Sequence, residues 1–485
     1  MRHSCAPWRH APLRSSDTME NLDIIIPRAQ AVESAPGVLK VESLGGVTTP
    51  ENWERFGTAL INSGKAMGLD LTQEGVPVKM LFSADIKVES FEITVTPDEV
   101  TIAGGDPAGL FYGATAFEQL LCVAVRRGTR GAEMPCGKVS DSPRFSYRGF
   151  MLDSARHFQR VQTIKDVLAL MARLRLNVFH WHICDSQGFR SESKLFPELN
   201  TLAGMTPGFY TAEEIKEICD FAAEHFITVI PEIEMPGHSK GLLALHPELC
   251  CDPENPGKEY CLAKPEVRTF LQKLIAEFAA LFPASKVIHL GGDEADTAHW
   301  DNCPACQKMM KDKGLTNIRQ LENDFMNDMA AYVRSLGLTP VTWFTGSIME
   351  QSTIIQVWRS IWELKETLPH GNRMVFSVHD QLYLDYPNTA AEPFENWMPV
   401  LCESGVYNTE PYAAWEKDIG DLLLGPETCL WTETVPDHRV MAKIMPRLAA
   451  FSETAWSLAV RKDWFSYTCR KEVLSAAGWF DIKAL

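Results

Sequence analysis

The sequence predicts an α/β protein in which a small α+β domain precedes a (β/α)8 TIM barrel. Apolar runs of strand length alternate with helical patterns over about 310 residues, and polar side chains gather where those runs end. Such alternation favours a closed barrel over an open sheet. A chain of 485 residues is also too long for one ordinary core. We assign residues 22–141 to the small domain and residues 142–485 to the barrel with a C-terminal helix.

Each predicted barrel strand is an apolar run rich in β-branched or aromatic residues. The eight runs begin at Arg148, Asn177, Ile227, Val287, Thr339, Thr353, Arg373 and Thr428. Helical patterns are clearest at residues 163–175, 211–225, 267–282 and 317–336, and Thr211 with Glu214 forms a capping box. The segment between Val378 and Thr428 is long and irregular, so it defines no clear seventh crossover.

The small domain is predicted from two strands and a hairpin. Residues 23–27 and 76–82 look like strands, and residues 90–105 form two alternating runs joined at Pro97 and Asp98. An amphipathic helix follows from Pro107, a residue suited to a first helical turn. Residues 140–143 are a linker candidate, and residues 1–21 are expected to be a disordered extension.

The composition indicates a soluble globular protein, with 45% hydrophobic and 22% charged residues. The net charge of −17 argues against nucleic acid or an anionic membrane as the main partner. No run approaches the roughly 20 apolar residues of a membrane helix. The first residues also lack the apolar region of a secretory signal. The expected location is therefore the cytoplasm, by default.

The thirteen cysteines leave two questions open. Cys303 and Cys306 have the spacing of metal ligands, but the sequence shows no second pair at ligand spacing. We therefore expect no metal site. Cys250, Cys251 and Cys261 are compatible with a loop disulfide and equally with reduced thiols. No glycine-rich phosphate loop is visible, so no cofactor is expected.

A predicted strand beginning at Val287 ends in two glycines and two adjacent acids, Asp293 and Glu294. Buried acids are costly unless neighbours satisfy them or chemistry uses them. In a barrel, functional side chains lie at the carboxyl ends of the strands. The other polar and aromatic residues at these ends are Asp153, Arg156, His157, Asp185, Glu234, His238, Trp343, Trp358, Tyr383, Asp385 and Glu433. Acids, a histidine, an arginine and aromatic rings suit a polar ligand with apolar faces, such as a sugar.

Eight motifs in order resemble the β-N-acetylhexosaminidases of glycoside hydrolase family 20. They are RGFMLDSARHF (148–158), NVFHWHICDSQGFR (177–190), PEIEMPGHS (231–239), HLGGDE (289–294), VTWF (341–344), IQVW (355–358), YLDYP (383–387) and LWTE (430–433). They span about residues 145–458. The N-terminal unit resembles the domain that usually precedes the family's barrel.

The resemblance implies a route that needs no enzyme nucleophile. Most glycosidases place two carboxyl groups on opposite sides of the scissile bond, facing each other. Adjacent residues on a strand point to opposite sides of that strand, so Asp293 and Glu294 would be poorly placed for this task. In this family the substrate's 2-acetamido oxygen attacks the anomeric carbon, which gives an oxazolinium ion and net retention. Glu294 would be the general acid, a role that needs a raised pKa. Asp293 would hold the acetamido N–H, and Asp185 and His238 would tune the proton on Glu294.

The resemblance also implies the residues that bind the sugar. Arg148 matches an arginine on O3 and O4, Asp385 and Glu433 match acids on O4 and O6, and Tyr383 matches a donor to the acetamido oxygen. The indoles that wall the acetamido methyl and floor the ring match Trp343, Trp358 and Trp431.

The implied activity is release of terminal β-linked GlcNAc, and of GalNAc as a second substrate, from glycans or chito-oligosaccharides. One alternative is a lacto-N-biosidase-like enzyme that releases a disaccharide. Another is a non-catalytic sugar-binding protein on the same scaffold. The expected partners are N-acetylhexosamine-terminated glycans, and the sequence defines no oligomeric state.

Overall fold

The computed structural model describes residues 22–127, 132–346, 348–392, 398–411 and 416–481. The predicted disordered extension, residues 1–21, lies outside them. Internal contacts divide the chain into two compact units, and the main division falls between Ser142 and Pro143. Among the described residues, unit 1 comprises residues 22–25, 29–142 and 469–481, and unit 2 comprises residues 26–28 and 143–468.

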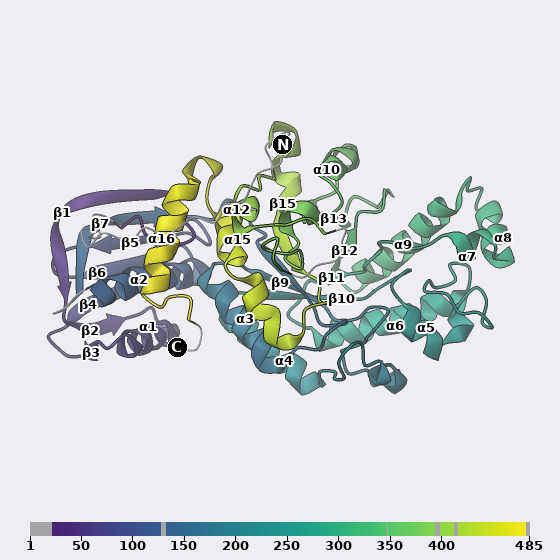
Figure 1. The fold of residues 1–485 in the computed structure, drawn as a ribbon, viewed down its shortest axis with the longest axis horizontal. Coiled ribbons are helices and arrows are strands. Elements are labelled where there is room, and N and C mark those ends of the chain that lie inside the picture. The colour runs from purple at the N-terminus through teal and green to yellow at the C-terminus, as the bar shows by residue number, and fades with distance from the viewer. Residues whose placement is uncertain (1–21, 128–131, 347, 393–397, 412–415, 482–485) are drawn as a thin grey trace. The chain divides into compact units, whose positions relative to one another are not determined.

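Unit 1 contains a seven-stranded mixed sheet in the order β1-β7-β5-β6-β4-β2-β3 (Figure 1). The predicted hairpin is confirmed, because β5 and β6 pair antiparallel with Ile93 opposite Ile102. The strands are β1 Ala31–Val41, β2 Ser43–Thr48, β3 Asp70–Leu71, β4 Val76–Phe82, β5 Phe91–Val95, β6 Val100–Gly104 and β7 Ala132–Asp141, and the helices are α1 Glu54–Ala66 and α2 Pro107–Arg127.

Two expectations for the predicted small domain are corrected. Residues 23–27 form no strand, although Ile25 and Ile26 are fully buried. A short buried run has the same composition whether its backbone is paired or irregular, and Pro27 has no N–H to donate. Helix α2 is long and apolar enough over Pro107–Val125 to span a membrane, contrary to the sequence estimate. It is mostly buried and contacts β5, β6 and β7, which identifies it as a core helix.

Unit 2 is a closed barrel of eight parallel strands, which confirms the predicted fold. Strand β15 begins at Leu423, earlier than the predicted Thr428. The strands are β8 Gly149–Asp153, β9 Val178–His182, β10 Thr228–Glu232, β11 Val287–His289, β12 Thr339–Trp343, β13 Ile354–Val357, β14 Met374–Phe376 and β15 Leu423–Leu430.

The crossover helices present apolar faces to the barrel, and the predicted capping box at Thr211 and Glu214 is present at the start of α4. The segment between β14 and β15 contains only short helices among its described residues. The helices of unit 2 are α3 Val161–Arg173, α4 Ala212–Glu224, α5 Lys240–Leu245, α6 Pro265–Leu281, α7 Ala298–Asp301, α8 Pro304–Asp312, α9 Ile318–Ser335, α10 Trp362–Thr367, α11 His379–Leu382, α12 Glu403–Tyr407, α13 Glu416–Ile419, α14 Val440–Ile444 and α15 Arg447–Trp456. Helix α16 Trp464–Ala476 begins in unit 2, and its residues from Cys469 onward belong to unit 1. Short 3-10 turns are η1 Pro197–Thr201, η2 Pro247–Leu249, η3 Leu368–His370, η4 Gly420–Leu422, η5 Asp437–Arg439 and η6 Ala459–Arg461.

The barrel interior contains a buried network of histidines and glutamates. His180 Nδ1 lies 2.9 Å from Glu427 Oε1, and His289 Nδ1 lies 3.0 Å from Glu232 Oε1. His182 Nδ1 bonds the other oxygen of Glu232. Burial opposes ionisation of Glu232, but the three imidazoles hold its pKa well below its usual range. Opposite charges therefore satisfy one another, as buried ionisable groups require.

Candidate active site

Asp293 and Glu294 follow β11 on a turn rather than on the strand. Strand β11 ends at His289, and Gly291, Gly292 and Glu294 all have positive φ, of 63°, 111° and 50°. A positive φ is natural for glycine and strained for glutamate. The turn brings both acids to one imidazole, so the alternation expected for adjacent strand residues does not apply here.

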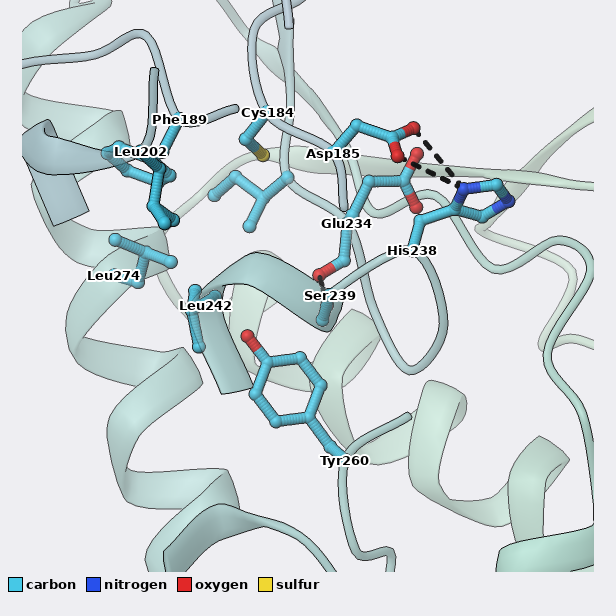
Figure 2. Close-up of a pocket in the computed structure, with 11 residues that line it drawn as sticks. Cys184, Asp185, Phe189, Leu202, Glu234, His238, Ser239, Leu242, Tyr260 and Leu274 are labelled. Carbon is cyan, nitrogen blue, oxygen red and sulfur yellow. Dashed lines mark hydrogen bonds and ion pairs between the residues drawn. The ribbon is translucent and has the colours of Figure 1, made fainter. Parts of the chain in front are cut away.

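His238 is the residue that both acids face. Its Nε2 lies 3.7 Å from Asp293 Oδ2 and 3.6 Å from Glu294 Oε2. On the other side of the ring, Nδ1 lies 3.3 Å from the Asp185 carboxylate. Dashed lines mark this contact in Figure 2. The fold thus brings together the three predicted side chains Asp185, His238 and Glu294. His238 also has a positive φ, of 51°.

Asp185 is held by a convergence of donors. Arg156 Nη2 lies 2.7 Å from its Oδ2, and His182 Nε2 lies 3.1 Å from the same atom. Burial opposes the charge, but Arg156, His182 and His238 hold the pKa of Asp185 well below its usual range. Asp185 is therefore an anion that orients His238 and links the site to the histidine network of the barrel.

These contacts set the protonation of the acid pair. Burial lowers the pKa of His238, but its bond to Asp185 and the charges of Asp293 and Glu294 raise it to about 12. The resulting imidazolium lowers the pKa of Glu294, whose side chain is 57% exposed. Burial raises the pKa of Asp293 to about 6, against the lowering effect of His238. The raised pKa expected at Glu294 is thus found at Asp293.

Three aromatic rings pack together near these groups. The Trp431 ring centroid lies 6.1 Å from that of Trp343 and 6.0 Å from that of Tyr383. The Arg156 guanidinium lies 5.1 Å from the Trp431 ring centre. Trp358, at the end of β13, is half-buried and donates from Nε1 to the carbonyl of Phe344 at 3.0 Å. Apolar ring faces and carboxylates thus occupy the same rim.

Two further predicted acids differ in burial. Asp385 is buried, and its Oδ1 accepts no hydrogen bond from any described residue. Burial and the charge of Glu433 raise the pKa of Asp385 to about 8. Glu433 is 44% exposed, and its Oε1 lies 3.7 Å from Arg156 Nη2. Asp293 Oδ1 is a second buried acceptor without a partner in the described part of the chain. Such atoms are acceptors for a ligand's donors.

The predicted sugar arginine, Arg148, is not among this group. Arg148 precedes β8, is fully buried, and donates to the carbonyls of Phe145 and Arg175 at 2.7 and 2.8 Å. A five-residue strand rises about 3.3 Å per residue, so Arg148 lies at the amino end of the barrel, opposite the site. Arg156, after the carboxyl end of β8, is the arginine at the site. The sequence signal for Arg156 was its position just after a predicted strand, at the end where functional side chains of a barrel lie.

Comparison with known proteins places the chain. Residues 145–459 match the model described as Glycosyl hydrolase family 20, catalytic domain, and residues 23–142 match domain 2 of that family. The chain belongs to glycosyl hydrolase family 20. It is therefore a glycoside hydrolase with a TIM barrel catalytic domain, as the resemblance implied.

The similar family 20 proteins carry related names. A beta-hexosaminidase from Akkermansia muciniphila is 29% identical over 82% of this chain and 86% of its own length. One from Porphyromonas gingivalis is 33% identical over 80% of this chain but only 53% of its own length. The structure of an exo beta-N-acetylglucosaminidase from Vibrio harveyi with N-acetylglucosamine has a TM-score of 0.86 at 27% identity, covering 98% of this chain and 80% of that one. A Bacteroides fragilis beta-N-acetylhexosaminidase gives 0.81 at 28%, covering 94% and 95%.

Glu234 belongs to this family 20 site although no role was predicted for it. It is buried beside His238, and its Oε2 accepts no hydrogen bond from the described residues. Burial and the charges of Glu232 and Asp293 raise its pKa well above the usual range. Glu234, Asp185 and His238 form the polar end of a pocket whose other walls are largely apolar (Figure 2). A neutral Glu234 limits the negative charge around the imidazolium.

The acids and histidines here also have atoms close enough to share an ion. The sets are His238 with Asp293 and Glu294, His182 with Glu232 and Glu234, and His180 with Glu232 and His289. In each set opposite charges already lie within 3.7 Å. Ion pairing accounts for these sets.

Proposed function

We propose that the protein is an exo-β-N-acetylhexosaminidase that hydrolyses terminal non-reducing β-linked GlcNAc, and GalNAc as a second substrate, with retention. The observation that carries this proposal is the placement of Asp293 and Glu294 around one imidazole, with Asp293 Oδ1 buried and unpartnered among the described residues. The names of similar proteins, and the N-acetylglucosamine complex of the Vibrio harveyi enzyme, support the substrate class.

In the proposed reaction Asp293 accepts a hydrogen bond from the substrate's acetamido N–H. This contact orients the acetamido oxygen toward the anomeric carbon and offsets the positive charge that develops on the nitrogen. The oxygen forms a bond to that carbon as the glycosidic bond breaks, which gives an oxazolinium ion. Glu294 gives its proton to the departing oxygen, and as a carboxylate it then takes a proton from the water that opens the ring.

The lowered pKa of Glu294 is compatible with this role because its side chain is 57% exposed. A bound sugar removes water from that carboxyl group, and desolvation favours its neutral form. Asp293 is already buried and stays paired with the His238 cation. Between the two pKa values the acid pair carries one proton, which Asp293 mainly holds in the free enzyme. Substrate binding thus moves this proton toward Glu294.

Arg156 and Asp385 support recognition of one terminal sugar. Arg156 uses three of its five N–H groups within the described chain, on Gln187, Asp153 and Asp185. Its remaining N–H groups suit a pair of sugar hydroxyl oxygens such as O3 and O4. Asp385 offers its free Oδ1 to a hydroxyl. Tyr383, Trp343 and Trp431 provide apolar surface for the acetamido methyl and the sugar ring.

The decisive test compares leaving groups. We expect Glu294→Gln to lose about 100- to 10,000-fold in turnover on chitobiose and much less on an aryl GlcNAc whose phenol needs no protonation. Asp293→Asn, the matched acid-to-amide change, should lose activity on both. Equal losses of Glu294→Gln on the two substrates would contradict the acid role.

Substrate assistance has its own readouts. The wild type should prefer aryl β-GlcNAc to aryl β-glucoside by several orders of magnitude, release the β-anomer first, and be inhibited by a thiazoline that mimics the oxazolinium ion. Comparable activity on the glucoside, or release of the α-anomer, would overturn the mechanism. Faster release from an aryl lacto-N-bioside than from aryl β-GlcNAc would instead favour a disaccharide-releasing enzyme.

A further inference from the structure

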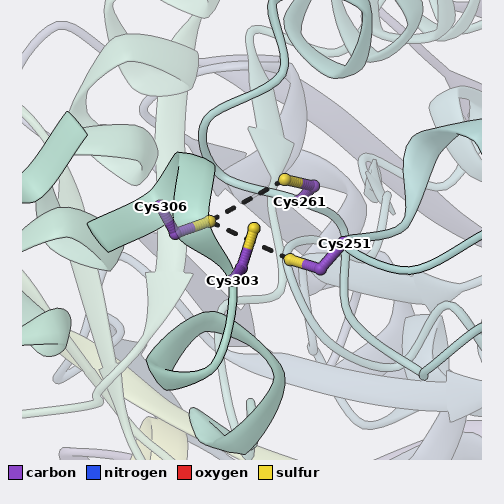
Figure 3. Close-up of side chains that lie close together, drawn as sticks. All are labelled: Cys251, Cys261, Cys303 and Cys306. Atoms are coloured by element: carbon purple, nitrogen blue, oxygen red, sulfur yellow. Dashed lines mark hydrogen bonds between the residues drawn. The ribbon is translucent and has the colours of Figure 1, made fainter. Parts of the chain in front are cut away.

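Four cysteines from two separate loops converge outside the active site. Cys251 and Cys261 lie between η2 and α6, and Cys303 and Cys306 lie at the start of α8. Figure 3 shows the four side chains close together. All four sulfur atoms lie within 4.8 Å of one another. All four are free thiols in the structure. The second pair, which the sequence spacing did not reveal, is therefore supplied by the fold.

The sulfur distances match a tetrahedral metal centre. Cys306 Sγ lies 3.7 Å from Cys261 Sγ and 3.9 Å from Cys251 Sγ. A zinc ion with Zn–S bonds of about 2.3 Å places its sulfurs about 3.8 Å apart at the tetrahedral angle. A disulfide joins only one pair and does not require one sulfur at nearly equal distance from two others. The arrangement therefore fits one ion better than two bonds.

The surroundings also favour bound thiolates. Cys261 and Cys306 are fully buried and Cys303 is 6% exposed, so the centre is closed to solvent on most sides. Cys303 is the N-cap of α8 and Cys306 lies in its first turn, where the positive end of the helix dipole favours anionic sulfur. Four thiolates and no open position are typical of structural zinc rather than catalytic zinc.

We propose that Cys251, Cys261, Cys303 and Cys306 bind one structural zinc ion. The ion joins the loop after β10 to the loop after β11. These are the loops that carry His238 and Glu294, respectively.

The segment between Cys251 and Cys261 transmits this constraint to the active site. The Lys258 carbonyl accepts the N–H of Ser239 at 3.1 Å, next to His238. Glu259 Oε1 accepts the N–H of Asp296 at 3.1 Å, two residues after Glu294. Zinc therefore fixes the segment that supports both catalytic loops. Its loss should lower kcat through their mobility.

The first test measures metal in the full-length wild type, purified without chelators or metal-affinity columns. Mass spectrometry of the metals should find about one zinc per chain, and mercurial titration of the thiols should release it. Reduced, metal-free protein should bind one equivalent of Co²⁺ with thiolate charge-transfer bands. Absence of zinc together with failure to bind Zn²⁺ or Co²⁺ would overturn the proposal. A chain mass lowered by disulfide formation among these four residues would overturn it as well.

The second test locates the ion. Cys251→Ser and Cys306→Ser should each hold less than about 0.2 zinc per chain and melt at least about 5 °C lower. The matched control Cys219→Ser, a half-buried cysteine of α4 outside the cluster, should keep both zinc and melting temperature. Full zinc retention by both cluster variants would place the ion elsewhere and refute the proposal. Where a variant fails to fold, the wild-type metal measurements decide.

Discussion

Replacing Asp185 by asparagine removes the charge at the centre of the site while keeping its shape. The carboxylate accepts from Arg156 at 2.7 Å, from His182 at 3.1 Å and from His238 at 3.3 Å, and its side chain is 1% exposed. Removing one member of a buried ion pair costs about 3–5 kcal/mol, because the remaining charge is uncompensated. Arg156 keeps Asp153 at 3.2 Å. We therefore expect the lower end of that range, about 3 kcal/mol.

The loss should depend on pH in a defined way. The pKa of Asp185 is lowered, so its stabilisation is present above its ordinary pKa of 3.8 and is lost as the pH falls. The pKa of His238 is raised from 6.5 to about 12, so its stabilisation is complete below 6.5 and is lost as the pH rises toward 12. The difference between wild type and Asp185→Asn should be largest between pH 3.8 and 6.5. Above that window it should shrink by up to about 1.4 kcal/mol per pH unit.

Urea unfolding followed by tryptophan fluorescence at pH 5.5 and pH 8 measures both effects. The control is Asp437→Asn, which removes another arginine pair of 2.7 Å, but with Arg160 73% exposed. Exposed pairs are worth about 0.2–1 kcal/mol. Equal losses for the two variants, or an Asp185→Asn loss that grows from pH 5.5 to pH 8, would refute the account of Asp185 as a buried anchor.

Three further predictions concern the site. Arg156→Lys should lower kcat/KM on aryl β-GlcNAc by about 10- to 100-fold, because one charge-assisted hydrogen bond to the sugar is lost. Arg148→Lys should instead lower the melting temperature, with a smaller effect on kcat/KM. The reverse pattern would restore Arg148 to the sugar site. The kcat/KM profile should be bell-shaped, because the active acid pair carries one proton, which Asp293 mainly holds in the free enzyme. The alkaline limb then lies near the Asp293 pKa of about 6, where that proton is lost, and the acid limb lies at the lowered pKa of Glu294, where a second proton binds. An optimum above pH 7 would contradict these assignments. Trp431→Ala should raise KM at least about tenfold, measured by initial rates, because it removes the apolar ring proposed to contact the sugar. An unchanged KM would exclude that contact.

The barrel could be predicted because its strands are buried on both faces and their composition is distinctive. The small unit was harder. Strand β1 contains Pro36 and Gly37, which are typical of a turn, and its side chains are mostly exposed. Its pairing with β7 shifts register between Ser34 and Val38, which accommodates these residues. The pairing of β1 with β7 overrides the local sequence pattern, and this pairing cannot be seen in the sequence of β1 alone.

The positions of the acids and of His238 also followed from strand ends, but Arg148 did not. Two arginines flank the same strand, and a motif match does not say which end of the barrel each occupies. Strand direction does, because the chain reaches the carboxyl end only at Asp153. The pKa order of Asp293 and Glu294 was out of reach for another reason. It depends on relative burial around His238, which requires coordinates.

The left-handed backbone of His238 and Glu294 has a consequence for mutational tolerance. Most side chains other than glycine, asparagine and aspartate are disfavoured at such positions, by roughly 1–2 kcal/mol. At Glu294, whose side chain is 57% exposed, a saturation library should therefore return well-folded but inactive glycine, asparagine and aspartate variants first, whereas at His238 the pairing with Asp185 opposes such changes. Selection for solubility alone would steer the Glu294 codon away from its native residue, so its retention in an evolving population reports selection for turnover.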